Sequence, residues 1–309
     1  MSYTLKIKEE IAEEKVTKSE MIAEMSGYIR NNGYIENKKF LMTSENIFLI
    51  ERFKRFLSEL YEIELKVEEI NNLNFSRRKL YSMTIDDKQD LILRDLGYLG
   101  DNDKYLETPP EYIVGANEEI RAYLRGVFQA VGSINDPTTS RYHMELLILH
   151  PNEAVFVQKL LNIFDLNVKI LDRKKGFMLY IKEAEKISDY LKILKANNAV
   201  LYFENARIYR DKKNQTNRLN NCEQANIDKV FTTATKQLEQ IKTIEEKDGL
   251  NLLDDKTKKA IEFRKKYPES SLKELSEIIS IETGKRITKS GLNHRFRKIK
   301  ELADKLEKL

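Results

Sequence analysis

The chain has 309 residues, of which 41% are hydrophobic and 34% charged, and its formal net charge at pH 7 is +4. The length and composition are typical of a water-soluble protein of two or three domains. No apolar run approaches the roughly 20 residues of a membrane helix, and the N-terminus lacks the apolar core of a signal peptide. A cytoplasmic protein is therefore expected. The single cysteine excludes an intrachain disulfide, and the three scattered histidines argue against a structural zinc site.

A nine-residue block occurs twice, 99 residues apart and without a gap. The copies are MSGYIRNNG at residues 25–33 and LRGVFQAVG at residues 124–132. Each is expected near the end of a helix that precedes strand-like sequence. Gly27 and Gly126 would allow two helices to approach closely, and we expect Gly33 and Gly132 to adopt the positive φ that ends many helices.

The elements predicted after the two copies also correspond. After the first copy we expect strands near 34–42, a helix over 45–60, strands near 64–70 and 79–85, and a helix from Asp86. After the second copy we expect strands near 142–149, a helix over 152–164, strands near 168–171 and 177–181, and a helix from Lys182. The sequence therefore predicts two αββαββα halves, at residues 1–98 and 99–222.

A connecting helix is predicted next, in a segment that spans residues 223–249. Apolar residues at helical spacing indicate an amphipathic helix that ends at Gly249: Ile227, Val230, Ala234, Leu238, Ile241 and Ile244. We expect Arg218, Asn221 and Asn226 to organise the start of this helix, since Asn side chains readily bond nearby backbone groups. Cys222 is expected to be a small buried or half-buried residue rather than a nucleophile.

The last segment, residues 250–309, has the pattern of a three-helix DNA-binding module. Residues 256–309 contain 16 Lys or Arg and 8 Asp or Glu, a net charge of +8 in a chain whose total is +4. We expect helices over 256–267, from Ser271 to Ile279, and from Thr288 or Ser290 onward, with an acidic N-cap at Asp254 and Asp255 and a capping box at Ser271 and Glu274. The connection 280–287 is long for a helix-turn-helix, so either the middle helix continues to Glu282 or the turn is a variant.

The final helix carries the candidate DNA-binding residues. Its apolar stripe is Leu292, Phe296, Ile299 and Leu302, and the polar positions around it are expected to face DNA: Thr288, Lys289, Ser290, Asn293, His294, Arg295, Arg297, Lys298 and Lys300. Asn can pair with adenine and Arg with guanine, so Asn293 and Arg295 are expected to read base edges. Lysines more commonly bind phosphates, which is the role expected of Lys289, Lys298 and Lys300.

Three phrases of the sequence, in this order, resemble the WhiA family. They are RAYLRG with GSINDP at 121–137, NR with NCE and AN at 217–226, and KSG with NHR at 289–295. The two nine-residue blocks resemble degenerate copies of the LAGLIDADG motif of homing endonucleases. The resemblance covers essentially the whole chain and implies an α+β fold with two pseudo-symmetric LAGLIDADG-like halves, a connecting helix and an all-α helix-turn-helix domain.

The same resemblance implies a bacterial transcription regulator, associated with sporulation in some lineages and with cell division or chromosome segregation in others. Double-stranded DNA is the implied partner, at the nucleoid, and RNA polymerase or a sigma factor stays open as a further partner. No membrane partner and no cofactor are expected. Cationic runs at 77–79 and 207–213 leave open whether the LAGLIDADG-like halves also contact DNA.

Catalysis by the repeat is not expected. An active nuclease of this type needs an acid at the eighth position of each block to hold divalent ions, and these positions are Asn32 and Val131. The sixth positions, Arg30 and Gln129, are not acids either. Glu24 and Asp136 lie close in sequence, but on the wrong turn of the helix or beyond its end, so we do not expect them to replace the missing acids. We therefore predict no catalytic residue, no metal site and no enzyme. The alternatives are an intron-type nuclease or maturase with other metal ligands, and an adaptor whose helix-turn-helix binds protein.

Overall fold

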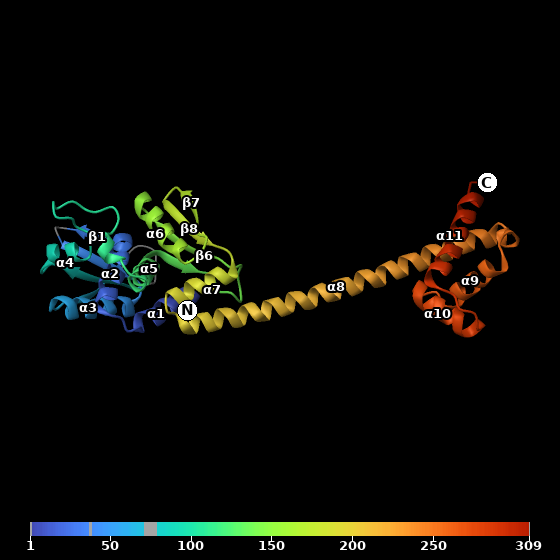
Figure 1. The fold of residues 1–309 in the computed structure, drawn as a ribbon, viewed down its shortest axis with the longest axis horizontal. Helices are drawn as coiled ribbons and strands as arrows, with labels where there is room; N and C mark the ends of the chain where they lie inside the picture. The colour runs from blue at the N-terminus through green and yellow to red at the C-terminus, as the bar shows by residue number, and fades with distance from the viewer. Residues whose placement is uncertain (1, 37–38, 71–78, 309) are drawn as a thin grey trace. The chain divides into compact units, whose positions relative to one another are not determined.

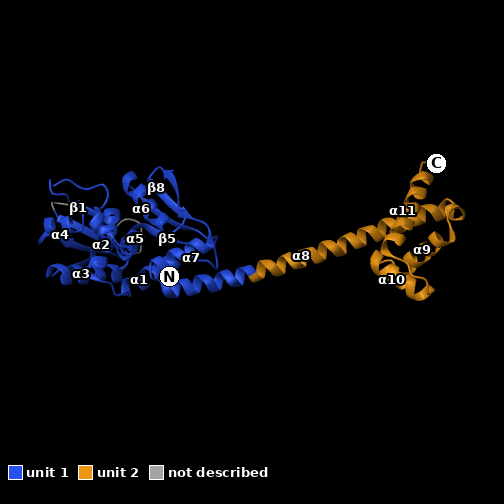
Figure 2. Cartoon of the chain, in the orientation of Figure 1, with its two compact units in different colours: residues 1–211 blue, residues 212–309 orange. Residues whose placement is uncertain are grey.

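The computed structural model describes residues 2–36, 39–70 and 79–308. The chain divides into two compact units, residues 1–211 and 212–309 (Figure 2). The first unit contains two four-stranded antiparallel sheets with helices packed on them, and the second is helical (Figure 1). The fold class expected from the sequence is confirmed.

The first half of the first unit follows the predicted order of elements. These are α2 (Lys18–Asn32), β1 (Gly33–Glu36), β2 (Lys39–Ser44), α3 (Ile47–Tyr61), β3 (Val67–Ile70), β4 (Leu80–Ile85) and α4 (Gln89–Asp95). The helix α1 (Tyr3–Glu13), which precedes them, was not among the expected elements. Its hydrophobic pattern is short, and it becomes stable by burying Ile7 and Ile11 against the rest of the unit.

The second half repeats this order. A short 3-10 turn, η1 (Glu111–Ile113), leads to α5 (Asn117–Val131), β5 (Gly132–Ile134), β6 (Met144–Ile148), α6 (Pro151–Ile163), β7 (Lys169–Arg173), β8 (Gly176–Ile181) and α7 (Ala184–Ile193). The strand orders are β1-β2-β4-β3 and β5-β6-β8-β7, so the two sheets have the same topology. Buried pairs such as Met42 opposite Met83 and Leu146 opposite Leu179 occupy corresponding places in the two central strand pairs.

The two halves meet along α2 and α5, the helices that contain the repeated blocks. A Cβ added to Gly27 would lie 2.3 Å from the Tyr123 carbonyl oxygen, and one added to Gly126 would lie 1.9 Å from the Glu24 carbonyl oxygen. Each glycine thus faces the backbone of the other helix. The close helix approach that the sequence predicted is confirmed.

The expected role of the last glycine in each block was wrong. Gly33 and Gly132 follow the helices with φ values of −98° and −81°, which is extended backbone open to any residue. Glycine is needed there for space instead. A Cβ would lie 2.3 Å from Cζ of Phe40 at the first position and 2.1 Å from Cδ2 of Phe128 at the second.

A buried ion network lies beside the glycine contact. Glu24, on α2, is fully buried and accepts hydrogen bonds from Arg52 on α3, at 2.8 and 2.9 Å, and from Arg125 on α5, at 3.2 Å. Arg125 and Lys195 also donate to Glu20, at 3.2 and 2.9 Å. A buried charge is tolerated only when it is paired and hydrogen-bonded, so these contacts constrain three helices at once.

The helix α8 (Asn197–Glu246) contains 50 residues and passes from the first unit into the second. The connecting helix expected from residue 223 is therefore only its latter part. Arg218, Asn221 and Asn226 lie in the helix interior and do not organise its start, as we had expected. The sequence predicted a helix after residue 223. It has no helix-breaking residue between 197 and 223, so the helix begins earlier, at Asn197.

The second unit continues with a 3-10 turn, η2 (Gly249–Leu252), and the helices α9 (Asp255–Lys266), α10 (Leu272–Thr283) and α11 (Lys289–Leu306). Their core includes Leu275, Ile279, Leu292, Phe296 and Ile299, together with Ile241 and Ile244 from the end of α8. Among the described residues, no helix is long and apolar enough to cross a membrane.

We predict that Gly126→Ala lowers the free energy of unfolding by about 3 kcal/mol or more, because the new methyl group would collide with backbone atoms that cannot move aside cheaply. Urea unfolding followed by circular dichroism measures this. Gly115→Ala is the matched control, since the nearest atom to its Cβ would lie at 3.4 Å. Equal losses in both variants would contradict the close helix contact.

The pKa of Glu20 generates a second prediction. Burial raises this pKa, but hydrogen bonds from the Thr17 backbone N–H, Lys195 and Arg125 outweigh burial and lower it to about 2. A depressed carboxyl pKa stabilises the fold above the pKa of the unfolded chain, and that stabilisation is lost as the pH falls toward 2. In Glu20→Gln, the free energy of unfolding should therefore fall less steeply than in the wild type between about pH 5 and pH 2.

Urea titrations at several pH values measure these slopes. Glu59→Gln is the control, because Glu59 is exposed on α3 and its replacement should leave the slope as it is in the wild type. A Glu20→Gln slope identical to that of the wild type would rule out the proposed contribution.

Candidate functional site

The second unit holds a helix-turn-helix. The capping box at Ser271 and Glu274 is present, and Asp254 caps α9, as predicted. Of the two alternatives for the long connection, the first is confirmed, since α10 continues to Thr283. Gly284 then ends it with φ 66°, in the left-handed region that favours glycine.

Two side chains fix the turn before the last helix. The Ser280 hydroxyl accepts a hydrogen bond from the Ile287 backbone N–H at 2.9 Å. Thr288 is the N-cap of α11, and its hydroxyl accepts from the Gly291 N–H at 3.1 Å. The start of α11 is thereby held against the end of α10, so the orientation of the candidate DNA-binding helix is set by local hydrogen bonds.

The predicted apolar stripe of α11 lies in the core. Leu292, Phe296 and Ile299 are buried, and Leu302 packs against them while partly exposed. Most of the nine candidate residues are exposed on the remaining surface of the helix and its N-cap: Thr288, Lys289, Ser290, Asn293, His294, Arg297, Lys298 and Lys300. At 100° per residue, Ser290, His294 and Arg297 point most directly away from the core, and Asn293 lies beside Arg297.

Two of the candidates are engaged within the unit. The Arg295 guanidinium is half-buried and donates to the Lys256 carbonyl oxygen at 3.1 Å, and Lys298 lies 3.3 Å from a carboxylate oxygen of Asp254. The pKa of Asp254 is held below its usual range chiefly by the Thr257 N–H, and also by Lys298. A DNA contact by Arg295 or Lys298 would have to compete with these bonds.

A second candidate site lies where α2 and α5 end. The eighth-position Asn32 donates to the Tyr28 hydroxyl and to the Thr43 carbonyl oxygen, both at 2.8 Å. The sixth-position Arg30 donates to the carbonyl oxygens of Gly97 and Leu106. Val131 packs against the core of the second half. These side chains are thus used in holding loops and strands, and none of them is a carboxylate.

The two acids weighed as replacements are also engaged elsewhere. Both oxygens of Glu24 bind arginines, as described above, and Asp136 accepts from the Thr138 hydroxyl at 2.6 Å and from the Tyr202 hydroxyl at 3.3 Å. Within the described residues there is no group of three or more His, Cys, Asp or Glu side chains that could hold a metal ion.

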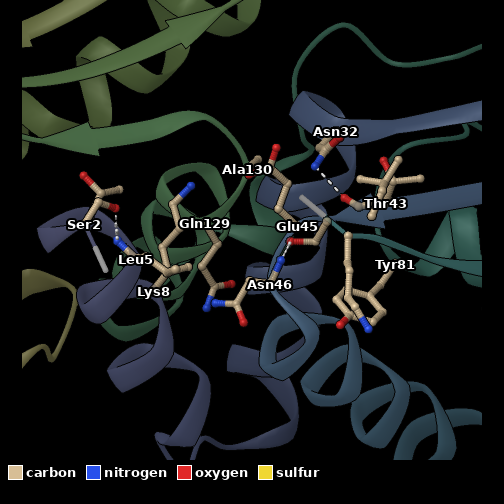
Figure 3. Close-up of a pocket in the computed structure, with 14 residues that line it drawn as sticks. Ser2, Leu5, Lys8, Asn32, Thr43, Glu45, Asn46, Tyr81, Gln129 and Ala130 are labelled. Carbon is tan, nitrogen blue, oxygen red and sulfur yellow. Dashed lines mark hydrogen bonds between the residues drawn. The ribbon is translucent and has the colours of Figure 1, made fainter. Parts of the chain in front are cut away.

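A cavity of about 900 Å³ adjoins the ends of these two helices (Figure 3). Its lining residues come from α1, α2, α5, β4 and the junction of β2 and α3: Ser2, Thr4, Leu5, Lys8, Asn32, Thr43, Ser44, Glu45, Asn46, Lys79, Leu80, Tyr81, Gln129 and Ala130. Sequence reasoning named Asn32 and Gln129 from the motif but missed Lys8 and Asn46. No sequence spacing could link these two, because they lie on different helices that only the fold brings together.

Several expectations for single residues need correction or stay open. Cys222 is exposed, not buried as expected, because this part of α8 has no covering element among the described residues. In the run 207–213, Arg210 donates to the carbonyl oxygens of Pro137 and Ser140 at 2.8 and 2.7 Å, while Lys212 and Lys213 are exposed. In the run 77–79, only Lys79 falls within the described residues, and it pairs with Glu69.

Family models match three consecutive parts of the chain. The WhiA N-terminal LAGLIDADG-like domain matches residues 18–99, the WhiA LAGLIDADG-like domain matches 120–213, and the WhiA C-terminal HTH domain matches 216–303. The chain belongs to the WhiA family. The resemblance noted in the sequence is thereby confirmed.

Relatives extend this result over the full length. A probable cell division protein WhiA from Exiguobacterium sibiricum is 38% identical over 311 residues, covering 99% of this chain and 97% of the relative. One from Lactiplantibacillus plantarum is 38% identical, covering 100% and 99%. The crystal structure of full-length WhiA from Thermatoga maritima superposes with a TM-score of 0.57 at 20% identity and covers 99% of both chains, which supports the fold.

The N-cap of α11 gives a prediction for the WhiA helix-turn-helix. Thr288→Ala should lower the stability of the second unit by about 1 kcal/mol, because it removes the hydroxyl that accepts from Gly291. Thermal unfolding of the full chain measures the loss. Thr288→Ser keeps the hydroxyl and should unfold close to the wild type. A loss of similar size in both variants would mean that the cap contributes little.

Proposed function

We propose that this member of the WhiA family is a sequence-specific DNA-binding regulator of transcription that acts at the nucleoid. Membership of the WhiA family and the helix-turn-helix domain support this proposal, and the observation that carries it is the surface of α11. Asn293, His294 and Arg297 are exposed there beside Lys289 and Lys300, with no acid between residues 285 and 300. Lysines supply affinity for phosphates, and Asn and Arg supply contacts to base edges.

The exposure of the candidates refines their roles. Asn293 and Arg297 are proposed to read base edges, because both side chains are exposed on the surface of α11. Arg295, first assigned to guanine, would have to give up its bond to the Lys256 carbonyl oxygen, so we propose a smaller contribution from it. Lys289 and Lys300 are proposed to bind phosphates, and Lys298 is proposed to do so by exchanging Asp254 for DNA.

The regulated process is proposed to be cell division or chromosome segregation, or sporulation in a lineage that sporulates. The relatives from Exiguobacterium sibiricum and Lactiplantibacillus plantarum are described as probable cell division proteins, which supports a role in cell division. RNA polymerase or a sigma factor stays a proposed further partner. The LAGLIDADG-like domain is proposed to be catalytically inactive, since Asn32 and Val131 stand where a nuclease of this type needs carboxylates.

The test is a salt series of duplex binding with the full chain, using a sequence selected from a random pool and a scrambled copy of it. Asn293→Ala and Arg297→Ala should each weaken binding to the selected duplex by roughly 10- to 100-fold, and binding to the scrambled duplex much less. Lys300→Ala should weaken both and reduce the slope of log affinity against log salt by about one.

Lys305→Ala is the matched control, because Lys305 is exposed in the last turn of the same helix and far from its N-terminal end. Losses of equal size on both duplexes for all variants would contradict base reading by α11. The same reactions with Mg²⁺ address the competing enzyme: nicking of either duplex would favour a nuclease or maturase. Absence of binding to any duplex would favour the protein-binding adaptor.

A further inference from the structure

The cavity beside the ends of α2 and α5 is lined by the N-terminal turns of two other helices. Ser2, Thr4 and Leu5 belong to the cap and first turn of α1, and Asn46 is the N-cap of α3. These helices have 11 and 15 residues, long enough for the backbone N–H groups at their starts to carry partial positive charge. Two such ends in one cavity favour an anion.

A lysine adds a full positive charge to this cavity. Lys8, on α1, is half-buried, and among the described residues its ammonium forms no ion pair within 4.0 Å. Burial lowers its pKa from 10.5 to about 8, although the negative charge of Glu45 opposes the shift. The ammonium lies 5.7 Å from the centre of the Phe128 ring, and Glu45 acts on it only from a distance, so an anionic ligand in direct contact would stabilise it further.

Two buried amide side chains are among the residues that line the same cavity. Gln129 is 3% exposed, and neither its Nε2 nor its Oε1 has a hydrogen-bond partner among the described residues. Asn46 is 6% exposed; its Oδ1 accepts from the Phe48 N–H, but its Nδ2 has no partner. In Figure 3, Lys8, Asn46 and Gln129 are drawn between Ser2 on the left and Tyr81 on the right. Buried polar groups in native proteins are rarely left unpaired, so these three atoms are candidates for pairing with a ligand.

We propose that this cavity binds a free mononucleotide, with the phosphate at Lys8 and the N-termini of α1 and α3, and the base edge at Asn46 and Gln129. An amide side chain offers a donor and an acceptor, which matches the paired groups along a base edge. Tyr81, also in the lining, supplies an aromatic face for the base. The volume of about 900 Å³ falls within the range of small-molecule sites. The proposal is independent of DNA binding by the second unit.

The experiment is a calorimetric titration of the full chain with inorganic phosphate, with each of the four 5′-ribonucleoside monophosphates, and with the matching nucleosides. We expect at least one monophosphate to bind more tightly than its nucleoside and than phosphate alone. Lys8→Met should weaken that binding by roughly 10-fold or more, because it removes a charged hydrogen-bond donor. Gln129→Met, of similar shape, should reduce the differences in affinity among the four bases.

Lys6→Met is the matched control, since Lys6 is exposed on α1 and does not line the cavity. Thermal unfolding distinguishes loss of binding from loss of fold, because neither Lys8→Met nor Gln129→Met removes a described salt bridge. No heat of binding with any monophosphate at millimolar concentration would overturn the proposal. So would binding that Lys8→Met and Lys6→Met reduce equally.

A duplex-binding arm separates a free nucleotide from the phosphate backbone of DNA. Lys8→Met should leave the affinity for duplex unchanged, and duplex should not displace the bound monophosphate. Weaker duplex binding by Lys8→Met, together with displacement by duplex, would assign the cavity to DNA and overturn the proposal. Because this arm measures α1 and not α11, failure here is distinguishable from failure of the proposed function.

Discussion

The first unit depends on the close approach of α2 and α5. At Gly27 and Gly126, each helix lies directly against the backbone of the other. The two halves are therefore in contact through main-chain atoms as well as side chains. Glu24 lies beside this contact and holds Arg52 and Arg125, which come from α3 and α5. A wider helix spacing would separate these charges while they remain buried, and separation of a buried ion pair is strongly unfavourable. Steric and electrostatic constraints therefore favour the same helix spacing.

The contact between α2 and α5 also bears on whether the degenerate motif could bind metal ions. In a fold of this kind, the ends of the two helices are where paired carboxylates would meet, and here the same positions have become structural. Asn32 holds Tyr28 and the Thr43 carbonyl, and Val131 is part of a hydrophobic core. Packing requires glycine at Gly27 and Gly126, whereas the contacts of Asn32 and Val131 do not require an acid at those positions. The absence of carboxylates at these two positions supports the proposal that the domain is catalytically inactive.

Each unit offers a different polar surface for the proposed ligands. In the second unit, a core of aliphatic side chains and Phe296 holds α11, and the Thr288 cap and the Ser280 bond set where it begins. These contacts leave one surface of α11 exposed and cationic. In the first unit, the ends of α1 and α3 surround a polar cavity in which buried amides lack partners. The surface of α11 suits an extended polyanion, and the cavity suits a small one.

The sequence by itself determined the repeat, the order of elements in both halves, and the three helices of the last module. These follow from local signals: periodicity, glycine spacing and capping residues such as Ser271 and Glu274, which act within a few residues of themselves. It also determined that the motif lacks acids, since that is a matter of residue identity. The exposed polar face of α11 was also predictable, because a helix that buries an apolar stripe on one side exposes the residues on its other side.

Only the tertiary structure decided the matters that depend on distant segments. Gly33 and Gly132 need to be glycine because of the rings of Phe40 and Phe128, not because of a positive φ. Arg295 donates a hydrogen bond to a carbonyl oxygen at the start of α9. Cys222 is exposed, because no other element among the described residues covers that part of α8. Lys8, Asn46 and Gln129 meet around one cavity although they are up to 121 residues apart in the sequence. Periodicity specifies which face of an element is buried, but not which other element it meets, and contacts of this kind are set by the packing of the whole unit.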